Sequence, residues 1–256
     1  MSLVFRYVFC VLLGMLAGTA NARDLYILVL GDQSAGNCHE HVYDAIPGIF
    51  LLGIDGRERP ATDSSRWGNC DGGSIWMPLA AHLKNQPNVS KIVLTPIIFH
   101  DMKVGQWMES PIADKVKTAL AAINQRGIKF DYALWQHGLA DVGAVDTDYL
   151  NQMRTLIKST TISTKIDKWL IGQFGACRGR RMESINKAHK KLGMQSMRNR
   201  FPGPGDVGLE SEERGPDCRL SAAGQEQMAQ RWFDAIKHAD VLSQHSQKES
   251  LVYYFK

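Results

Sequence analysis

Three short segments of the sequence combine glycine with side chains typical of a catalytic site. They are Gly31–Asn37 (GDQSAGN), Trp135–Asp141 (WQHGLAD) and Gly215–Gly224 (GPDCRLSAAG). The first offers the Ser34 hydroxyl as a nucleophile, and a serine hydroxyl is a poor nucleophile without a neighbouring base. The third offers Arg219, whose guanidinium does not accept a proton near neutral pH because its pKa exceeds about 12. The segments therefore indicate a candidate site for nucleophilic chemistry.

Apolar segments predict the strands that position these residues. The runs Asp24–Gly31 and Lys91–Phe99 are largely apolar, as in parallel strands buried on both faces. Three further strands are expected over Ile49–Gly56, Tyr132–Trp135 and Trp169–Phe174.

Helices are expected between the strands. They cover Ser74–Lys84 (regular from about Pro78), Pro111–Gly127, Tyr149–Lys158, Met182–Leu192 and a last helix from the N-cap Ser221 to about His238. The alternation predicts the α/β class, a doubly wound parallel sheet flanked by helices, with ligands bound beyond the carboxyl ends of the strands. The polar tail 242–256 is expected to be either disordered or a late edge strand.

Residues 1–22 predict a cleavable secretory signal peptide. Arg6 supplies the charge, Tyr7–Ala17 the apolar run, and Ala20–Ala22 a cleavage site between small residues. The apolar run is shorter than the roughly 20 residues of a membrane-spanning helix. We therefore expect cleavage after Ala22, a secreted or periplasmic protein without a membrane span, and one domain over 23–241.

Four cysteines remain after this cleavage: Cys38, Cys70, Cys177 and Cys218. An even number in an exported protein favours two disulfides, and the alternative is free buried thiols. We favour the pairs Cys38–Cys70 and Cys177–Cys218, because each would join loops expected at the same end of the sheet. The segment 38–41 (Cys-His-Glu-His) also carries ligand types for a metal, but the disulfide competes for its cysteine. No metal or cofactor is therefore expected.

The formal net charge is only +4, from 30 basic and 26 acidic residues that are interspersed along the chain. Nucleic-acid binding usually leaves a basic patch or stripe. We therefore expect no nucleic-acid partner, and the sequence leaves the oligomeric state open.

Several segments match, in order, the blocks of a known family: the end of the first strand at Gly31, then Gly73–Trp76, Trp135–Asp141 and Arg214–Gly224. On these residues the chain resembles the SGNH hydrolases, in the branch of the sialate O-acetylesterases and acetylxylan esterases. The resemblance covers most of Asp24–His238. It implies a flavodoxin-like three-layer sandwich that hydrolyses acetyl esters on a carbohydrate. The alternative is a catalytically inactive glycan-binding or accessory protein on the same scaffold.

The first block of the family, Gly-Gln-Ser-Asn, aligns in two ways. Without a gap, Gln33 falls at the position of the nucleophilic serine and Ser34 at that of the asparagine. With Asp32 as an insertion, Gln33 and Ser34 match the Gln-Ser pair, and Ser34 is the candidate nucleophile. Gln33 and Asn37 are candidates for substrate contacts in this block.

Two N–H groups are candidates for stabilising a developing oxyanion. The resemblance implies this role for the amide of Gly73. The alternative is that Gly73 is a glycine at the entry to the following helix. The family block Trp-His-Gln-Gly-Glu-x-Asp has its His and Gln exchanged here. His137 therefore stands where the family has a glutamine that donates to the oxyanion. The alternative role for His137 is that of a hydrogen-bonded loop residue. Gln136 is a candidate for substrate binding, and Leu139 replaces the glutamate.

The third strand is followed by His100 and Asp101, where the family has small residues. Their bulk would narrow a pocket and bring two titratable groups to its rim. His100, like His137, is a candidate replacement base, with a polar loop residue as the alternative. Asp101 is a candidate for substrate contact.

The last block departs most from the family pattern Arg-x-Asp-Gly-Cys-His-x-Ser-x-x-Gly. Pro216 replaces the aspartate and Arg219 the histidine that is the general base. Asp217 lies one residue from the aspartate position and could pair with Arg219. The planar guanidinium of Arg219 also suits the carboxylate of an acidic sugar. The expected partner is therefore an acetylated or acidic carbohydrate, with Asp217 and Arg219 among its contacts.

Overall fold

The computed structural model describes residues 22–254 apart from 54, 64–69, 174–175, 178–179, 206–208, 210–212 and 216–217, and the side chains of 176–177, 180–181 and 245–254 are not described. Except for Ala22, the expected signal peptide lies outside the described residues. Among the helices described, none is both long and apolar enough to cross a membrane.

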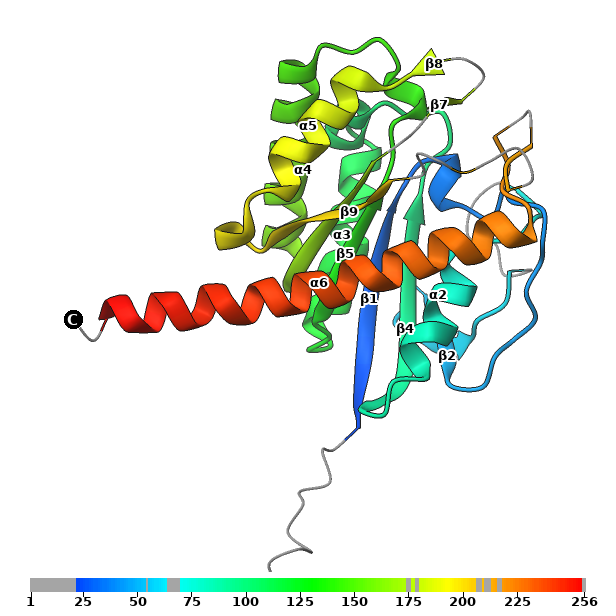
Figure 1. The fold of residues 1–256 in the computed structure, drawn as a ribbon, viewed down its shortest axis with the longest axis horizontal. Coiled ribbons are helices and arrows are strands. Elements are labelled where there is room, and N and C mark those ends of the chain that lie inside the picture. Colours follow the sequence, from blue (N-terminus) through cyan, green and yellow to red (C-terminus); the bar gives the residue numbers. More distant parts are fainter. Residues whose placement is uncertain are drawn as a thin grey trace, which may run out of the picture.

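A seven-stranded sheet forms the centre of the molecule (Figure 1). In spatial order its strands are β3 (Glu58–Pro60), β2 (Ile49–Leu52), β4 (Val89–Ile98), β1 (Arg23–Gly31), β5 (Phe130–Gln136), β6 (Ile166–Gln173) and β9 (Arg200–Gly205). All neighbours are parallel except β2 and β3. The short strands β7 (Ala176–Cys177) and β8 (Arg180–Arg181) pair separately. The predicted α/β class and parallel sheet are confirmed.

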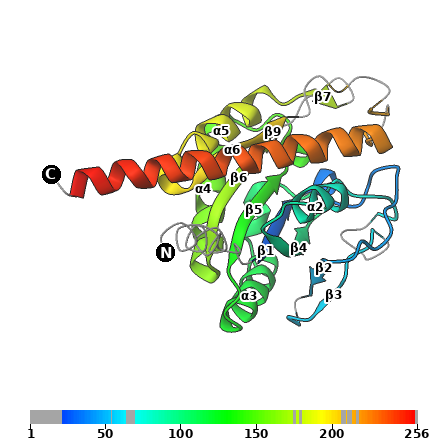
Figure 2. The same ribbon diagram turned by 60° about the horizontal axis from the view of Figure 1, so that its bottom comes forward.

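Helices cover both faces of the sheet, giving three layers (Figures 1 and 2). One face carries α2 (Trp76–Lys84) and α6 (Ala222–Tyr254), and the other carries α3 (Ile112–Gln125), α4 (Asp146–Ser163) and α5 (Glu183–Gly193). Short 3₁₀ helices lie in the connections: η2 (Gln33–Ala35), η3 (Val104–Met108), η4 (Leu139–Asp141) and η5 (Ser196–Arg198).

The central strand β1 shows why its sequence is almost continuously apolar. Leu25, Ile27 and Val29 pack into the core under α2 and α6. Leu28 and Leu30 point to the opposite face and pack into the core under the other three helices. Because both faces are covered, the alternation of side chains along the strand produces no polar positions.

Three elements differ from the sequence-based expectation. Helix α2 starts at Trp76, two residues before Pro78. Proline is tolerated in the first turn because the N–H groups of that turn have no acceptor within the helix, so the N–H that proline lacks is not needed. Strand β9 was not expected, since its sequence RFPGPG is rich in proline and glycine; it is an edge strand, where proline is tolerated. Helix α6 continues to Tyr254, so both alternatives for the tail are wrong over its described part.

Candidate functional site

Asp32 is the residue that joins the first block to the loop after β5. Its side chain is fully buried. One carboxylate oxygen accepts hydrogen bonds from the Ser34 N–H (3.0 Å) and the Ser34 hydroxyl (2.6 Å). The other accepts from the N–H groups of Gly138 (2.8 Å) and Leu139 (2.9 Å). Asp32 therefore fixes η2 against this loop at the carboxyl edge of the sheet.

Two further hydrogen bonds bring the remaining blocks to the same place. The indole N–H of Trp76 donates to the carbonyl oxygen of Ala35 at 2.6 Å. The N–H of Leu220, in the last block, donates to Nδ1 of the buried His39 at 3.2 Å. The four blocks recognised in the sequence therefore converge at one end of the sheet.

Gly31 allows β1 to end this close to β5. A Cβ atom at this position would lie 1.9 Å from the carbonyl oxygen of Gln136 and 2.7 Å from the Cβ of Ala35. No side chain fits there without displacing the backbone of β5. Glycine is therefore required at the strand end that presents Asp32 and η2.

Ser34 lies half-buried on η2 with its hydroxyl directed at Asp32. Asp32 is the N-cap of this short helix, and its carboxylate accepts from the Ser34 backbone N–H as well. Among the described residues, no histidine is a hydrogen-bond partner of the Ser34 side chain. The local geometry is that of a helix cap, in which the hydroxyl completes the bonding of a buried carboxylate.

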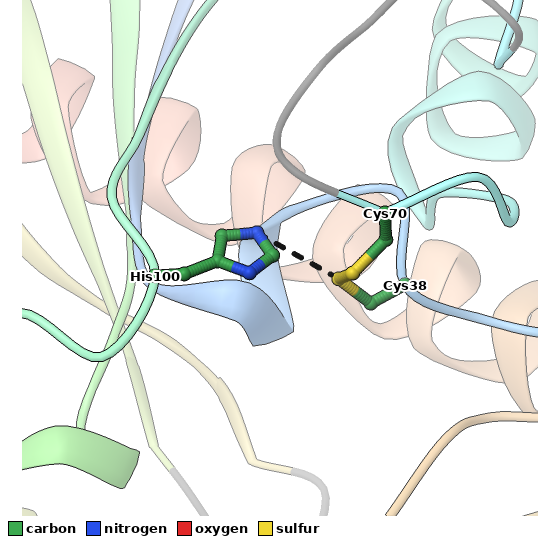
Figure 3. A group of neighbouring side chains, drawn as sticks. All are labelled: Cys38, Cys70 and His100. Atoms are coloured by element: carbon green, nitrogen blue, oxygen red, sulfur yellow. Dashed lines mark hydrogen bonds between the residues drawn. A yellow bond between two sulfur atoms is a disulfide. The ribbon is translucent and has the colours of Figure 1, made fainter.

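His100 lies against the disulfide between Cys38 and Cys70 (Figure 3). Its Nε2 is 3.7 Å from Sγ of Cys38, and the Cα atoms of the two cysteines are 5.0 Å apart. Figure 3 shows the imidazole directed at the sulfur atoms, in agreement with its position close to Gly36. The ring is half-buried, so it is the predicted base that keeps contact with solvent.

The disulfide Cys38–Cys70 confirms one of the two favoured pairs. Cys218 is also disulfide-bonded, whereas the side chain of Cys177, its expected partner, lies outside the described residues. One ligand atom each of Cys38, Cys70 and His100 lies within 4.8 Å of the others. A metal needs thiolates, however, and a disulfide offers none. This cluster therefore does not fit a metal while the cysteines are oxidised.

His137, the other predicted base, is enclosed in the protein. Its ring is fully buried and stacks on Trp135 with 4.8 Å between ring centroids. Nε2 donates to the carbonyl oxygen of Met102 at 2.8 Å, and Nδ1 lies 3.3 Å from the hydroxyl of Tyr149. Both ring nitrogens are thus engaged in the interior, which is the geometry of the hydrogen-bonded loop residue.

A buried polar network that the sequence did not suggest continues from His137. The Tyr149 hydroxyl lies 2.9 Å from Nε2 of His189, and the Asp141 carboxylate accepts from the Val104 N–H at 2.8 Å. Burial raises the pKa values of Asp141 and Tyr149. Burial, together with the positive charge that His137 would carry, lowers the pKa of His189 to about 3. Burial therefore favours the neutral form of all three groups.

Gly73 makes a close backbone approach at the entry to α2. Its N–H donates to the carbonyl oxygen of His39 at 2.8 Å. A Cβ atom at this position would lie 1.5 Å from the carbonyl oxygen of His41. The amide that the resemblance assigns to the oxyanion is thus engaged within the protein.

The predicted substrate contacts divide into interior and exposed residues. Asn37 is buried and donates to the carbonyl oxygen of Asp63 at 3.1 Å, and Gln136 is also buried. Asp101 is exposed in a left-handed turn with φ of 52°, which aspartate tolerates better than most residues. Arg219 is exposed as well.

Gln33 is half-buried beside Ser34, whereas Asp217 lies outside the described residues. The sequence placed the blocks correctly at one edge. It could not show which of their side chains turn inward, because that depends on contacts between distant segments.

Solved structures with similar folds support the resemblance drawn from the motifs, although no protein-family model and no curated protein matches this sequence. A protein from Arabidopsis thaliana superposes with a TM-score of 0.64 at 17% identity, covering 83% of this chain and 98% of the other. The chain has the fold of the SGNH hydrolases.

Two carbohydrate esterases have the same fold at low identity. A carbohydrate acetylesterase from Xanthomonas citri gives a TM-score of 0.54 at 14% identity, over 84% of this chain and 56% of that one. A family two carbohydrate esterase from Clostridium thermocellum, solved with cellohexaose, gives 0.52 at 13% identity, over 85% and 65%. The SGNH fold expected from the sequence is thus confirmed as a fold.

Proposed function

We propose that this protein is an exported carbohydrate-binding protein on an SGNH hydrolase scaffold, without a working serine–histidine pair. The observation that carries the proposal is the hydrogen bond from the Ser34 hydroxyl to the Asp32 carboxylate at 2.6 Å. This carboxylate already accepts three backbone N–H groups. The Ser34 hydroxyl is thus the fourth donor to one buried carboxylate, which is a structural role.

Three other features support the loss of hydrolytic chemistry. Arg219 stands where the family has its base, and a guanidinium accepts no proton near neutral pH. The Gly73 N–H donates within the backbone, and the His137 ring is buried. A serine without a base and without oxyanion donors loses most of its catalytic power.

The exposed polar residues at this edge support carbohydrate binding. Asp101 and Arg219 are exposed, with Gln33 half-buried beside the cap. A guanidinium and a carboxylate bind sugar hydroxyls well, and the planar fork of Arg219 also suits the carboxylate of a uronic or sialic acid. The structural neighbours that are carbohydrate esterases support the same class of ligand.

Export is supported by the sequence of residues 1–22 and by the disulfide Cys38–Cys70, since disulfides persist in oxidising compartments. We propose that the protein acts outside the cytoplasm, where polysaccharides carrying acetyl or acidic groups occur.

A thermal-shift titration with oligosaccharides tests the binding proposal. The protein should be stabilised by oligomers containing uronic acid, because a ligand that binds only the folded state raises the melting temperature. Arg219→Gln should weaken this stabilisation, whereas Arg57→Gln, an exposed arginine on the β2–β3 hairpin, should leave it unchanged. If acidic and neutral oligomers raised the melting temperature equally, and did so in the native protein and in both variants, Arg219 would have no role in binding.

The second candidate function is a carbohydrate O-acetylesterase. The fold shared with the carbohydrate acetylesterase from Xanthomonas citri favours it, and the Asp32 carboxylate, which accepts from the Ser34 hydroxyl, would then take the serine proton in place of an imidazole. In that case acetylated xylan should release acetate, and Ser34→Ala should abolish the release.

A further inference from the structure

A cavity lies at the opposite end of the sheet from the candidate site. Its volume is about 490 Å³, and it opens between α4 and η5, where β6 and β9 begin. Sites for small molecules typically measure about 300–1,000 Å³. The cavity is therefore large enough for a small organic ligand.

Apolar side chains form part of the wall of this cavity. Ile157 and Trp169 are buried, and Ile166 is half-buried at the start of β6. Ile162, on the last turn of α4, also lines the cavity with 73% of its surface exposed. This wall would hold the apolar part of a ligand.

Four cations surround the same cavity: Arg154, Lys158, Arg198 and Arg200. No carboxylate is among the lining residues, and within the described part of the chain none of the four belongs to an ion pair. The pKa of Arg200 is lowered by burial and then by the charges of Arg198 and Arg154. In the described part of the chain, these like charges therefore have no carboxylate paired with them.

One hydrogen bond prepares this cluster for a ligand. The Arg200 guanidinium is oriented by a hydrogen bond to Oε1 of Gln195 at 2.8 Å. An arginine held in this way loses less side-chain freedom when it binds an anion.

We propose that this cavity binds a small amphipathic anion. Its apolar body would lie against Ile157, Ile166 and Trp169. Its carboxylate, sulfate or phosphate group would lie among the four cations, where arginine forks bind such groups by paired hydrogen bonds. The site is independent of the carbohydrate-binding proposal, because it shares no residue with the carboxyl edge of the sheet.

A fluorescence titration of the mature protein with anilinonaphthalene sulfonate tests this site. The probe combines an aromatic body with one sulfonate, and it should bind saturably with one molecule per chain. N-phenylnaphthylamine has the same body without the charge and should bind at least about tenfold more weakly, as expected when a charged hydrogen bond is lost. Inorganic sulfate should compete with the charged probe alone.

Matched variants locate the binding. Arg198→Gln with Arg200→Gln should weaken the charged probe about tenfold or more and leave the neutral probe unchanged. Arg57→Gln with Arg126→Gln, two exposed arginines far from this cavity, should change neither. Near-ultraviolet circular dichroism confirms that both double variants keep the native packing.

Any of four outcomes would overturn the proposal. One is equal affinity for the two probes, and another is unchanged affinity in the Arg198/Arg200 variant. The third is loss of probe binding in Arg219→Gln, which would place the probe at the other site. If vesicles of anionic lipid bind the protein while the soluble probe does not, the cation cluster serves a membrane surface and the small-ligand proposal is wrong.

Discussion

At the scale of single residues, Asp32 links the first block of the candidate site to the loop after β5. It is buried and accepts four hydrogen bonds, one from a hydroxyl and three from backbone N–H groups. An amide in its place would direct an NH₂ group at two of these donors. The two donors that face this NH₂ group lose their hydrogen-bond acceptor, which destabilises the folded state.

We therefore expect Asp32→Asn to lower the free energy of unfolding by about 2–3 kcal/mol, measured by urea denaturation. Ser34→Ala removes one hydroxyl and leaves the other three donors paired, so it should cost about 1 kcal/mol or less. Equal losses in the two variants would mean that Asp32 does not hold the loop of Gly138.

His189 gives a second prediction for a single side chain, in the form of a pH dependence. Its pKa is about 3 in the folded protein, against about 6.5 in an unfolded chain. As the pH falls below about 6.5, the unfolded state takes up a proton that the folded state does not. Stability is therefore complete above this pH and is lost progressively toward pH 3, by at most about 1.4 kcal/mol per pH unit.

Denaturation between pH 7 and pH 4 measures this slope, and His189→Gln should make it shallower. The glutamine keeps a polar group near the Tyr149 hydroxyl but does not titrate. His238→Gln, on the exposed face of α6, should leave the slope as in the native protein. The account fails if the two substitutions change the slope equally.

At the scale of the elements, the junction of β1 and β5 determines whether the blocks can meet. Gly31→Ala places a Cβ atom 1.9 Å from the carbonyl oxygen of Gln136, which is part of β5. The strands must separate to accommodate it, and we expect a loss of about 3 kcal/mol or more, or no folded protein.

Gly127→Ala is the control for this prediction. Gly127 has a φ of 76° after α3, with no atom within 4 Å of a substituted Cβ. The strained backbone alone should cost about 1–2 kcal/mol. Thermal unfolding compares the two variants, and a smaller loss at Gly31 than at Gly127 would contradict the close packing of β1 and β5.

The elements also show how far the sequence determines the fold. The apolar runs of β1 and β4 predict buried parallel strands because both of their faces are covered. Strand β9 could not be predicted, since its prolines are acceptable only at the edge of a sheet. The sequence predicts the end of α6 too early, near His238, because the residues that follow are largely polar, whereas the helix continues to Tyr254. The segment 225–254 contains neither glycine nor proline.

For the molecule as a whole, the disulfide Cys38–Cys70 links the first block to the loop before α2. It joins residues 32 apart in the sequence, and the chain-entropy model gives about 3–4 kcal/mol for a loop of this length. The double variant Cys38→Ser/Cys70→Ser should lose stability of this order in urea denaturation. No change relative to the native protein under oxidising conditions would mean that the link does not constrain the unfolded chain.

The candidate site was predictable in its location and only partly in its chemistry. Glycines and block order place Gly31, Gly73 and the loop after β5 at one edge, as found. The inward direction of His137 depends on Met102 and on Tyr149, which belong to other segments. Contacts of this kind leave no local pattern in a single sequence.

Labelling with a fluorophosphonate probe, followed by mass spectrometry of the intact mature protein, tests the central claim most directly. Such probes react with serines that an adjacent base activates. If the Ser34 hydroxyl serves only to complete the bonding of Asp32, the protein should remain unlabelled, as should Ser34→Ala. Stoichiometric labelling of the native protein that disappears in Ser34→Ala would contradict this account and identify a working serine hydrolase.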